Sequence, residues 1–265
     1  MRSCNSDSIN SCATLPPTPQ RHTSHIVGHP LSSPQLSTMN KFAIKQELFK
    51  QSFPPIFVTT VDERLLQRDI LLSFLHTASG DGTIGVSAVY GNRCVITSIA
   101  FATLTSTLII HFVKQHGRRA LTLIKECILN NSRYTKYAFK MDTLALSLFT
   151  DLSLQISDAV DLLSSRITGN RHSLETLMGV MGGEAILHRH NVKSLFLEDK
   201  KEMSPSDVAM QAWAACLVAI ISDTMSIPRI DTLKLTQKAC YFRATSFLLT
   251  LSIVLAIGFP GQDCA

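Results

Sequence analysis

Residues 84–112 constrain the fold most, because they hold three β-rich runs in quick succession. The runs cover residues 84–90, 95–102 and 107–112, with GNR between the first two and LTS between the last two. Links as short as these join strands that lie antiparallel to each other. The sequence therefore predicts a three-stranded antiparallel meander.

Helical and strand-like segments alternate on both sides of this meander. Before it, a β-branched run from residue 55 leads into apolar residues at helical spacing up to residue 75. After it, helical patterns alternate with short apolar runs, in the order 118–129, 137–139, 142–152, 156–161, 173–181 and 205–222. Ser204 and Pro205 form a typical start for the last helix. This order predicts an α/β domain with a mixed sheet flanked by helices.

The two ends of the chain differ in composition from the middle. Residues 1–53 are rich in Ser, Thr and Pro and hold few bulky apolar groups, so burial cannot offset the entropy of ordering them. We predict a disordered arm over 1–53, one domain over 54–222 and an extension over 223–265. The extension contains an uncharged apolar segment, 244–259, which is shorter than the roughly 20 residues of a membrane-spanning helix. A packed segment is favoured over a membrane anchor.

Charge and cysteine content restrict the compartment and the partners. Lys and Arg number 25 against 20 for Asp and Glu, and the excess is not gathered into a basic run. This balance is compatible with a nucleic-acid partner without requiring one. The seven cysteines form no C-x-x-C pair, which indicates reduced thiols rather than disulfides or a zinc site. No secretory signal is visible either, so we predict an intracellular protein, nuclear or cytoplasmic.

Several segments together carry a resemblance to a known family. They include FVTTVDERLLQRDILLSFL, IGVSAVYGNRCVITSIAFATLTSTLIIHF, KYAFKMDTLALSLF and SPSDVAMQAWAACLVA. In local sequence and order, residues 54–222 resemble the ribonuclease D and Werner-type 3′–5′ exonuclease family. The resemblance implies a ribonuclease H-like fold, with an antiparallel meander followed by parallel strands. It also implies DNA or RNA as partner, and hydrolysis at a 3′ end by two divalent metals that four carboxylates hold.

The residues at the family's motif positions depart from its pattern. Ser87 and Val89 stand where the family has the Asp and Glu of its first motif. Trp213 stands where the family has a Tyr that orients water, and Leu217 where it has its last Asp. Asp142 matches the Asp of the second motif, at the start of a predicted helix. Asp142 is thus the one retained candidate for a catalytic and metal-binding carboxylate.

A charge estimate indicates what one carboxylate can do. Two dications about 4 Å apart repel by roughly 16 kcal/mol at an effective dielectric near 20, four times the value for unit charges. Asp142 alone does not neutralise that repulsion, so we predict no cofactor, with Mg²⁺ or Mn²⁺ only if activity remains. The sequence is interpreted as a catalytically inactive, nucleic-acid-binding exonuclease-like protein. The alternatives are an active metal-dependent exonuclease and a membrane-tethered scaffold protein.

The remaining candidates have simpler explanations beside the functional ones. Lys136 and Lys140 flank the strand that leads to Asp142 and are the predicted nucleic-acid contacts, although isolated cations are usually solvated. Trp213, the only tryptophan, lies among apolar residues, which favours core packing over base stacking. The HRH sequence at 188–190 is expected to be a solvated loop rather than a metal site. A protein partner bound through the remnant cleft is also compatible with the sequence.

Overall fold

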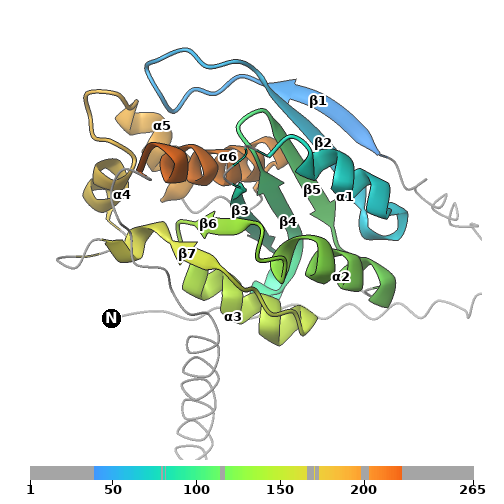
Figure 1. The fold of residues 1–265 in the computed structure, drawn as a ribbon. Coiled ribbons are helices and arrows are strands. Elements are labelled where there is room, and N and C mark those ends of the chain that lie inside the picture. Colours follow the sequence, from blue (N-terminus) through green and yellow to red (C-terminus); the bar gives the residue numbers. More distant parts are fainter. Residues whose placement is uncertain are drawn as a thin grey trace, which may run out of the picture. The chain divides into compact units, whose positions relative to one another are not determined.

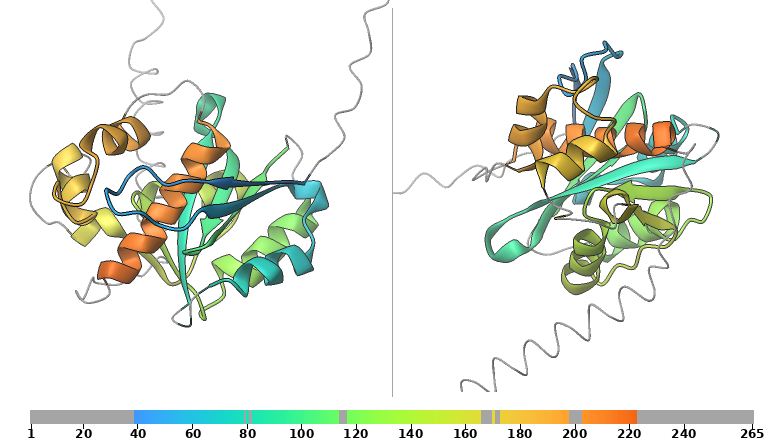
Figure 2. Two further views of the ribbon diagram at one scale, coloured as in Figure 1. Left: turned by 90° about the horizontal axis from the view of Figure 1, so that it is seen from above. Right: turned by 90° about the vertical axis from the view of Figure 1, so that its left-hand side faces the viewer.

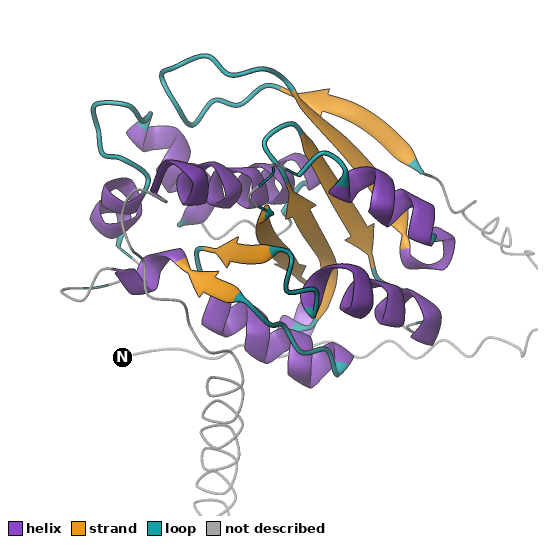
Figure 3. Ribbon diagram, in the orientation of Figure 1, coloured by secondary structure: helices purple, strands orange, loops and turns teal. Residues whose placement is uncertain are grey.

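A single seven-stranded sheet organises the computed structural model of the chain (Figures 1 and 3). The structure describes residues 39–78, 80, 82–113, 117–165, 170, 173–197 and 203–222. Along the chain the strands are β1 (Asn40–Ile44), β2 (Ile56–Asp62), β3 (Thr83–Tyr90), β4 (Ile96–Ala102), β5 (Ser106–His111), β6 (Thr135–Ala138) and β7 (Ala159–Asp161). In the sheet they lie in the order β1-β2-β5-β4-β3-β6-β7.

The pairing of the strands confirms the predicted fold class. The strands β3, β4 and β5 form the antiparallel meander, in which Ser87 pairs with Ala100 and Ala100 with Ile109. On one side of the meander β6 lies parallel to β3 and β7 parallel to β6, while on the other side β2 lies parallel to β5. A meander extended by parallel strands is the ribonuclease H-like arrangement of a mixed sheet.

Helices cover both faces of the sheet, as the right-hand view of Figure 2 shows. Five short helices are η1 (Glu63–Leu65), η2 (Asn92–Cys94), the π-helix η3 (Lys125–Leu129), η4 (Leu162–Ser165) and α4 (Leu174–Val180). The others are α1 (Arg68–Leu75), α2 (Arg118–Ile124), α3 (Met141–Leu152), α5 (Arg189–Phe196) and α6 (Pro205–Ser222). One hydrophobic core joins the sheet to α1, α2, η3 and α3, and a second joins its other face to α4, α5 and α6.

The folded region begins earlier than the sequence analysis predicted. The strand β1 pairs antiparallel with β2, from Asn40 opposite Thr60 to Ile44 opposite Ile56. Leu48 and Phe49 follow it and are buried in the second core, where Phe49 also bridges to Leu187. The predicted boundary of the disordered arm at residue 53 is therefore too late, because residues 40–53 contribute a strand and two core side chains. Residues 1–38 lie outside the described part of the chain.

The second difference concerns residues 188–190, which are not a loop. His188 is the N-cap residue of α5, and Arg189 and His190 lie in its first turn. The buried residues of this helix are Val192 and Leu195. Arg189 forms ion pairs with Glu175 of α4 and with Glu184. No helix within the described residues is long and apolar enough to cross a membrane. The predicted extension 223–265, including 244–259, lies outside the described residues.

Candidate functional site

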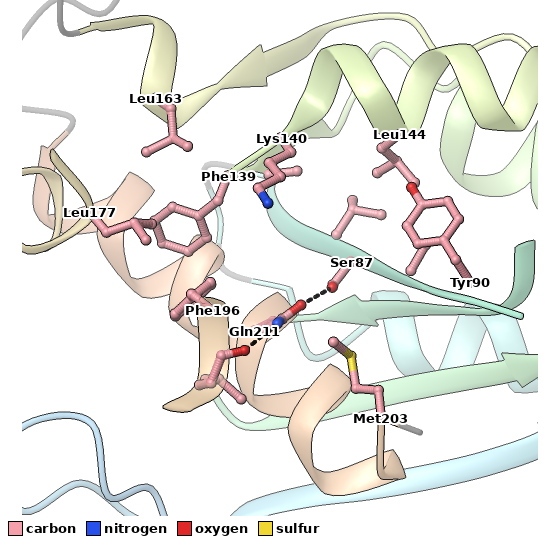
Figure 4. A pocket seen from close by; sticks show the side chains of 14 residues that line it. Ser87, Tyr90, Phe139, Lys140, Leu144, Leu163, Leu177, Phe196, Met203 and Gln211 are labelled. Carbon is pink, nitrogen blue, oxygen red and sulfur yellow. Dashed lines mark hydrogen bonds between the residues drawn. The ribbon is translucent and has the colours of Figure 1, made fainter. Parts of the chain in front are cut away.

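A cavity of about 210 Å³ lies beside the second half of β3, between the start of α3 and the helices α4, α5 and α6 (Figure 4). Ser87, which stands at a position of the family's first motif, is one of the residues that line it. Its described lining comprises Val86, Ser87, Ala88, Tyr90, Ala138, Phe139, Lys140, Leu144, Leu163, Leu177, Leu195, Phe196, Met203 and Gln211. Strands β3 and β6 supply one wall and the helices supply the others.

A glycine in β3 determines how α6 lies against this wall. A Cβ atom on Gly85 would clash with the carbonyl oxygen of Ala212 and would lie 2.6 Å from the backbone nitrogen of Cys216. Only glycine allows the backbone of α6 to approach β3 so closely. Ser87 lies two residues after Gly85 on β3. Because α6 comes so close to the strand, the Ser87 side chain reaches Gln211, the residue before Ala212 on α6.

Gln211 connects three elements at the cavity by hydrogen bonds. The Ser87 hydroxyl donates to Gln211 Oε1 at 2.8 Å, and Gln211 Nε2 donates to the Leu195 carbonyl oxygen of α5 at 2.8 Å. Both polar ends of the glutamine are therefore satisfied by neutral groups. These two bonds tie β3, α6 and α5 together at the position where the family resemblance implies metal ligands. Sequence comparison alone missed Gln211, because it assigned the motif positions on this helix to Trp213 and Leu217.

The chemistry of the lining does not fit a pair of divalent metal ions. Among the described lining residues there is no Asp, Glu or His, and the one charged side chain is the Lys140 ammonium. Mg²⁺ and Mn²⁺ require several carboxylate or carbonyl oxygens that cancel their charge, whereas a nearby ammonium opposes cation binding. Within the described residues, no three His, Cys, Asp or Glu side chains gather in a way that could hold a metal ion.

Asp142 lies outside the cavity lining, in the first turn of α3. Its Oδ1 accepts a hydrogen bond of 2.7 Å from the Thr143 backbone nitrogen and one of 3.4 Å from the Thr143 hydroxyl. A carboxylate in the first turn of a helix is stabilised by the helix dipole, which gives Asp142 a local structural role. The assignment of Asp142 as a metal-binding and catalytic carboxylate therefore stays a prediction.

Tyr90 lines the cavity and feels the charges of two acidic groups outside its lining. Desolvation raises the pKa of Tyr90 to about 12, and the negative charges of Asp151 and Asp142 act in the same direction. A hydrogen bond with the Ser147 side chain opposes this shift. The phenol is therefore neutral at physiological pH and can offer a hydrogen bond at the cavity's edge. The sequence analysis did not single out this residue.

Three residues at the other motif positions pack against the core. Leu217 belongs to the second hydrophobic core, Val89 is partly buried and packs against it, and neither lines the cavity. Trp213 is 1% exposed, donates from Nε1 to the Leu104 carbonyl oxygen at 2.9 Å, and meets the rings of Phe49 and Phe53 edge to face. Trp213 thus has the core position that its apolar neighbours in the sequence favour.

The structure corrects the prediction for Lys136. This side chain is fully buried, and its ammonium donates to the carbonyl oxygens of Tyr134 at 2.8 Å and Asn131 at 3.2 Å. Desolvation lowers the pKa of Lys136 to about 8, against the opposing charge of Asp158. A buried ammonium bonded to the backbone cannot contact phosphate from solution. Lys140, by contrast, is the exposed N-cap residue of α3 and lines the cavity.

Comparison with known proteins found no matching family model and no matching curated protein. Among solved structures, the EXO domain of Aedes aegypti Nibbler resembles the chain at 13% identity with a TM-score of 0.40, covering 64% of this chain and 91% of that one. Trypanosoma brucei RNase D in complex with GMP resembles it at 9% identity and 0.42, and the match covers 69% of this chain and 62% of the trypanosomal one.

A third solved structure, the EXD2 exonuclease domain soaked in Mn and GMP, resembles the chain at 15% identity with a TM-score of 0.31. That match covers 77% of this chain and 99% of the other. The described part of the chain is an α/β domain whose mixed seven-stranded sheet has the ribonuclease H-like arrangement of strands.

Proposed function

We propose that this chain is a catalytically inactive 3′–5′ exonuclease-like protein that binds DNA or RNA without hydrolysing it. The observation that carries the proposal is the hydrogen bond between Ser87 and Gln211. At the first-motif position this bond joins two neutral side chains, and the described lining of the cavity has no carboxylate. Two-metal hydrolysis requires converging negative charge at that place.

Binding of nucleic acid rests on charge and on the fold. The chain carries a formal net charge of +5, and Lys140 is exposed at the edge of the cavity. Exposed cations attract phosphates without reading sequence, so we expect binding that weakens steeply as salt is added. Lys140 is the described cation we assign to phosphate contact, and we leave Lys136 out of the proposal because its side chain is buried. Asp142 then serves as a helix-start residue rather than as a metal ligand.

The test incubates the full chain with 3′-labelled DNA and RNA oligonucleotides in Mg²⁺ and, separately, in Mn²⁺. We expect the oligonucleotides to keep their length, and fluorescence anisotropy to show salt-sensitive binding by the same protein. Asp142→Asn should change neither result. Asp69→Asn is the matched control, because Asp69 also lies in the first turn of a helix but on α1 and exposed.

Two outcomes would reject parts of this proposal separately. Metal-dependent shortening that Asp142→Asn abolishes and Asp69→Asn leaves intact would show that the chain is an active exonuclease with other ligands. Intact oligonucleotides without any anisotropy change at low salt would remove nucleic-acid binding while leaving catalytic inactivity in place.

A further inference from the structure

We infer that the cavity beside β3 binds a small apolar molecule that carries one anionic group, a medium-chain carboxylate being the simplest example. This inference goes beyond the proposed function, which concerns nucleic-acid strands at the surface of the domain. It rests on three properties of the described lining: its apolar wall, its single charge and its volume.

The apolar wall is built from side chains that the second core already holds in place. Leu163, Leu177 and Leu195 are at most 8% exposed and belong to the packing of η4, α4 and α5 against the sheet. The rings of Phe139 and Phe196 meet edge to face, with centroids 4.8 Å apart. Because packed side chains keep their rotamers, this wall needs no rearrangement to receive an apolar group. Preformed apolar concavities with few polar groups are the usual sites for small ligands.

The charge of the lining indicates which apolar molecule fits. In Figure 4 the side chain of Lys140, the exposed N-cap residue of α3, borders the cavity between Phe139 and Ser87. No carboxylate among the described residues lies within ion-pair distance of its ammonium. Ser87 and Gln211 satisfy each other, so they add no net charge. A ligand with an anionic end would pair with Lys140 while its apolar part lies against the leucines and phenylalanines.

The volume restricts the size of the ligand. About 210 Å³ lies below the roughly 300–1,000 Å³ that is typical of sites for drug-sized molecules. A short chain or a single ring fits this space better than a larger molecule. Among the described lining residues there is no acidic side chain that could hold a metal ion between the protein and an anion. Lys140 would therefore contact the anionic group directly.

The experiment compares three probes that share one apolar chain and differ in the charge of the head group. Octanoate, 1-octanol and octylammonium are titrated into the full chain by isothermal titration calorimetry at low salt and without nucleic acid. The variant Lys140→Met removes the ammonium and keeps an apolar stem of similar length. Lys193→Met is the matched control, because Lys193 is exposed on α5 and does not line the cavity.

We expect octanoate to bind about tenfold more tightly than octanol, which corresponds to about 1.4 kcal/mol, and octylammonium to bind least. Lys140→Met should bring octanoate to the affinity of octanol, with octanol unchanged, and Lys193→Met should alter neither. Equal binding of the three probes, undetectable binding of octanoate, or a preference for octanoate that survives Lys140→Met would each overturn the inference. None of these results depends on whether the chain binds or degrades oligonucleotides.

Discussion

Replacing Lys136 by Met should change how the stability of the domain depends on pH. Lys136 is fully buried, and its pKa is lowered from 10.5 to about 8. In the unfolded chain the ammonium keeps its ordinary pKa, so between pH 8 and pH 10.5 the unfolded state binds more protons than the native state. The free energy of unfolding therefore rises with pH across this window. Below about pH 8 both states are protonated, and the native state carries the full cost of a buried ammonium.

The magnitude follows from the width of the window. A shift of about 2.5 pKa units corresponds to about 3 kcal/mol, at about 1.4 kcal/mol for each unit. Between pH 8 and pH 10 the wild-type chain should thus gain about 2–3 kcal/mol from this one group. Lys136→Met lacks this titrating group. The unfolding free energy of wild type minus that of the variant should therefore increase by about 2–3 kcal/mol from pH 8 to pH 10. Tyr90 and the other groups contribute equally to both proteins and cancel.

Urea unfolding in the presence of a thiol reductant, at pH 7, 8, 9 and 10, measures this difference for wild type, Lys136→Met and Lys193→Met. Only the dependence on pH is predicted, because Met also leaves the Asn131 and Tyr134 carbonyl oxygens without the ammonium. Lys193→Met should stay parallel to wild type, since Lys193 is exposed. A difference between wild type and Lys136→Met that stays constant from pH 8 to pH 10 would refute the reasoning and show that the ammonium is solvated in the native state.

Two further predictions test the packing around the site. Gly85→Ala should destabilise the domain by about 3 kcal/mol in urea unfolding, because the new methyl group would clash with the backbone of α6. Gly117→Ala, where nothing lies within 4 Å of the added atom, should cost at most about 1 kcal/mol, because Gly117 is the N-cap residue of α2. Equal effects of the two changes would contradict the close approach of α6. Trp213, the single tryptophan, is 1% exposed, so acrylamide should quench its fluorescence far more weakly in the native chain than in urea. Similar quenching in both states would contradict its core position.

The order of the elements could be predicted from sequence because each signal was local and strong. The meander followed from short links between β-rich runs, and its pairing is as expected. The strand β1 was missed because it is short, lies at the sheet's edge and offers only two apolar residues, Phe42 and Ile44, to the second core. The helix α5 was missed because the polar residues His188, Arg189 and His190 stand at its start. Its short apolar stripe, Val192, Leu195 and Phe196, comes only after them and packs toward α4 and α6.

The candidate site was harder to predict, because sequence does not show which way a side chain faces. On α6, resemblance to the family pattern placed the motif at Trp213 and Leu217, whereas the residue that reaches Ser87 is Gln211. The rotation of α6 is determined by the contact at Gly85, which links residues far apart in the chain. Lys136 likewise looked like a surface cation, and only strand alternation within the folded sheet puts it on a buried face.

These observations also explain how the domain keeps its shape with neutral side chains at the motif positions. Carboxylates that converge without metal ions repel one another, so a site built from them depends on bound cations. Here the bonds of Gln211 to Ser87 and to the Leu195 carbonyl oxygen connect β3, α6 and α5 without any ion. The apolar wall of the cavity is continuous with the second core and needs no charge to hold it. The arrangement of strands and helices around the cavity can therefore be stable in the absence of Mg²⁺ or Mn²⁺, which leaves the cavity free to accept a different kind of ligand.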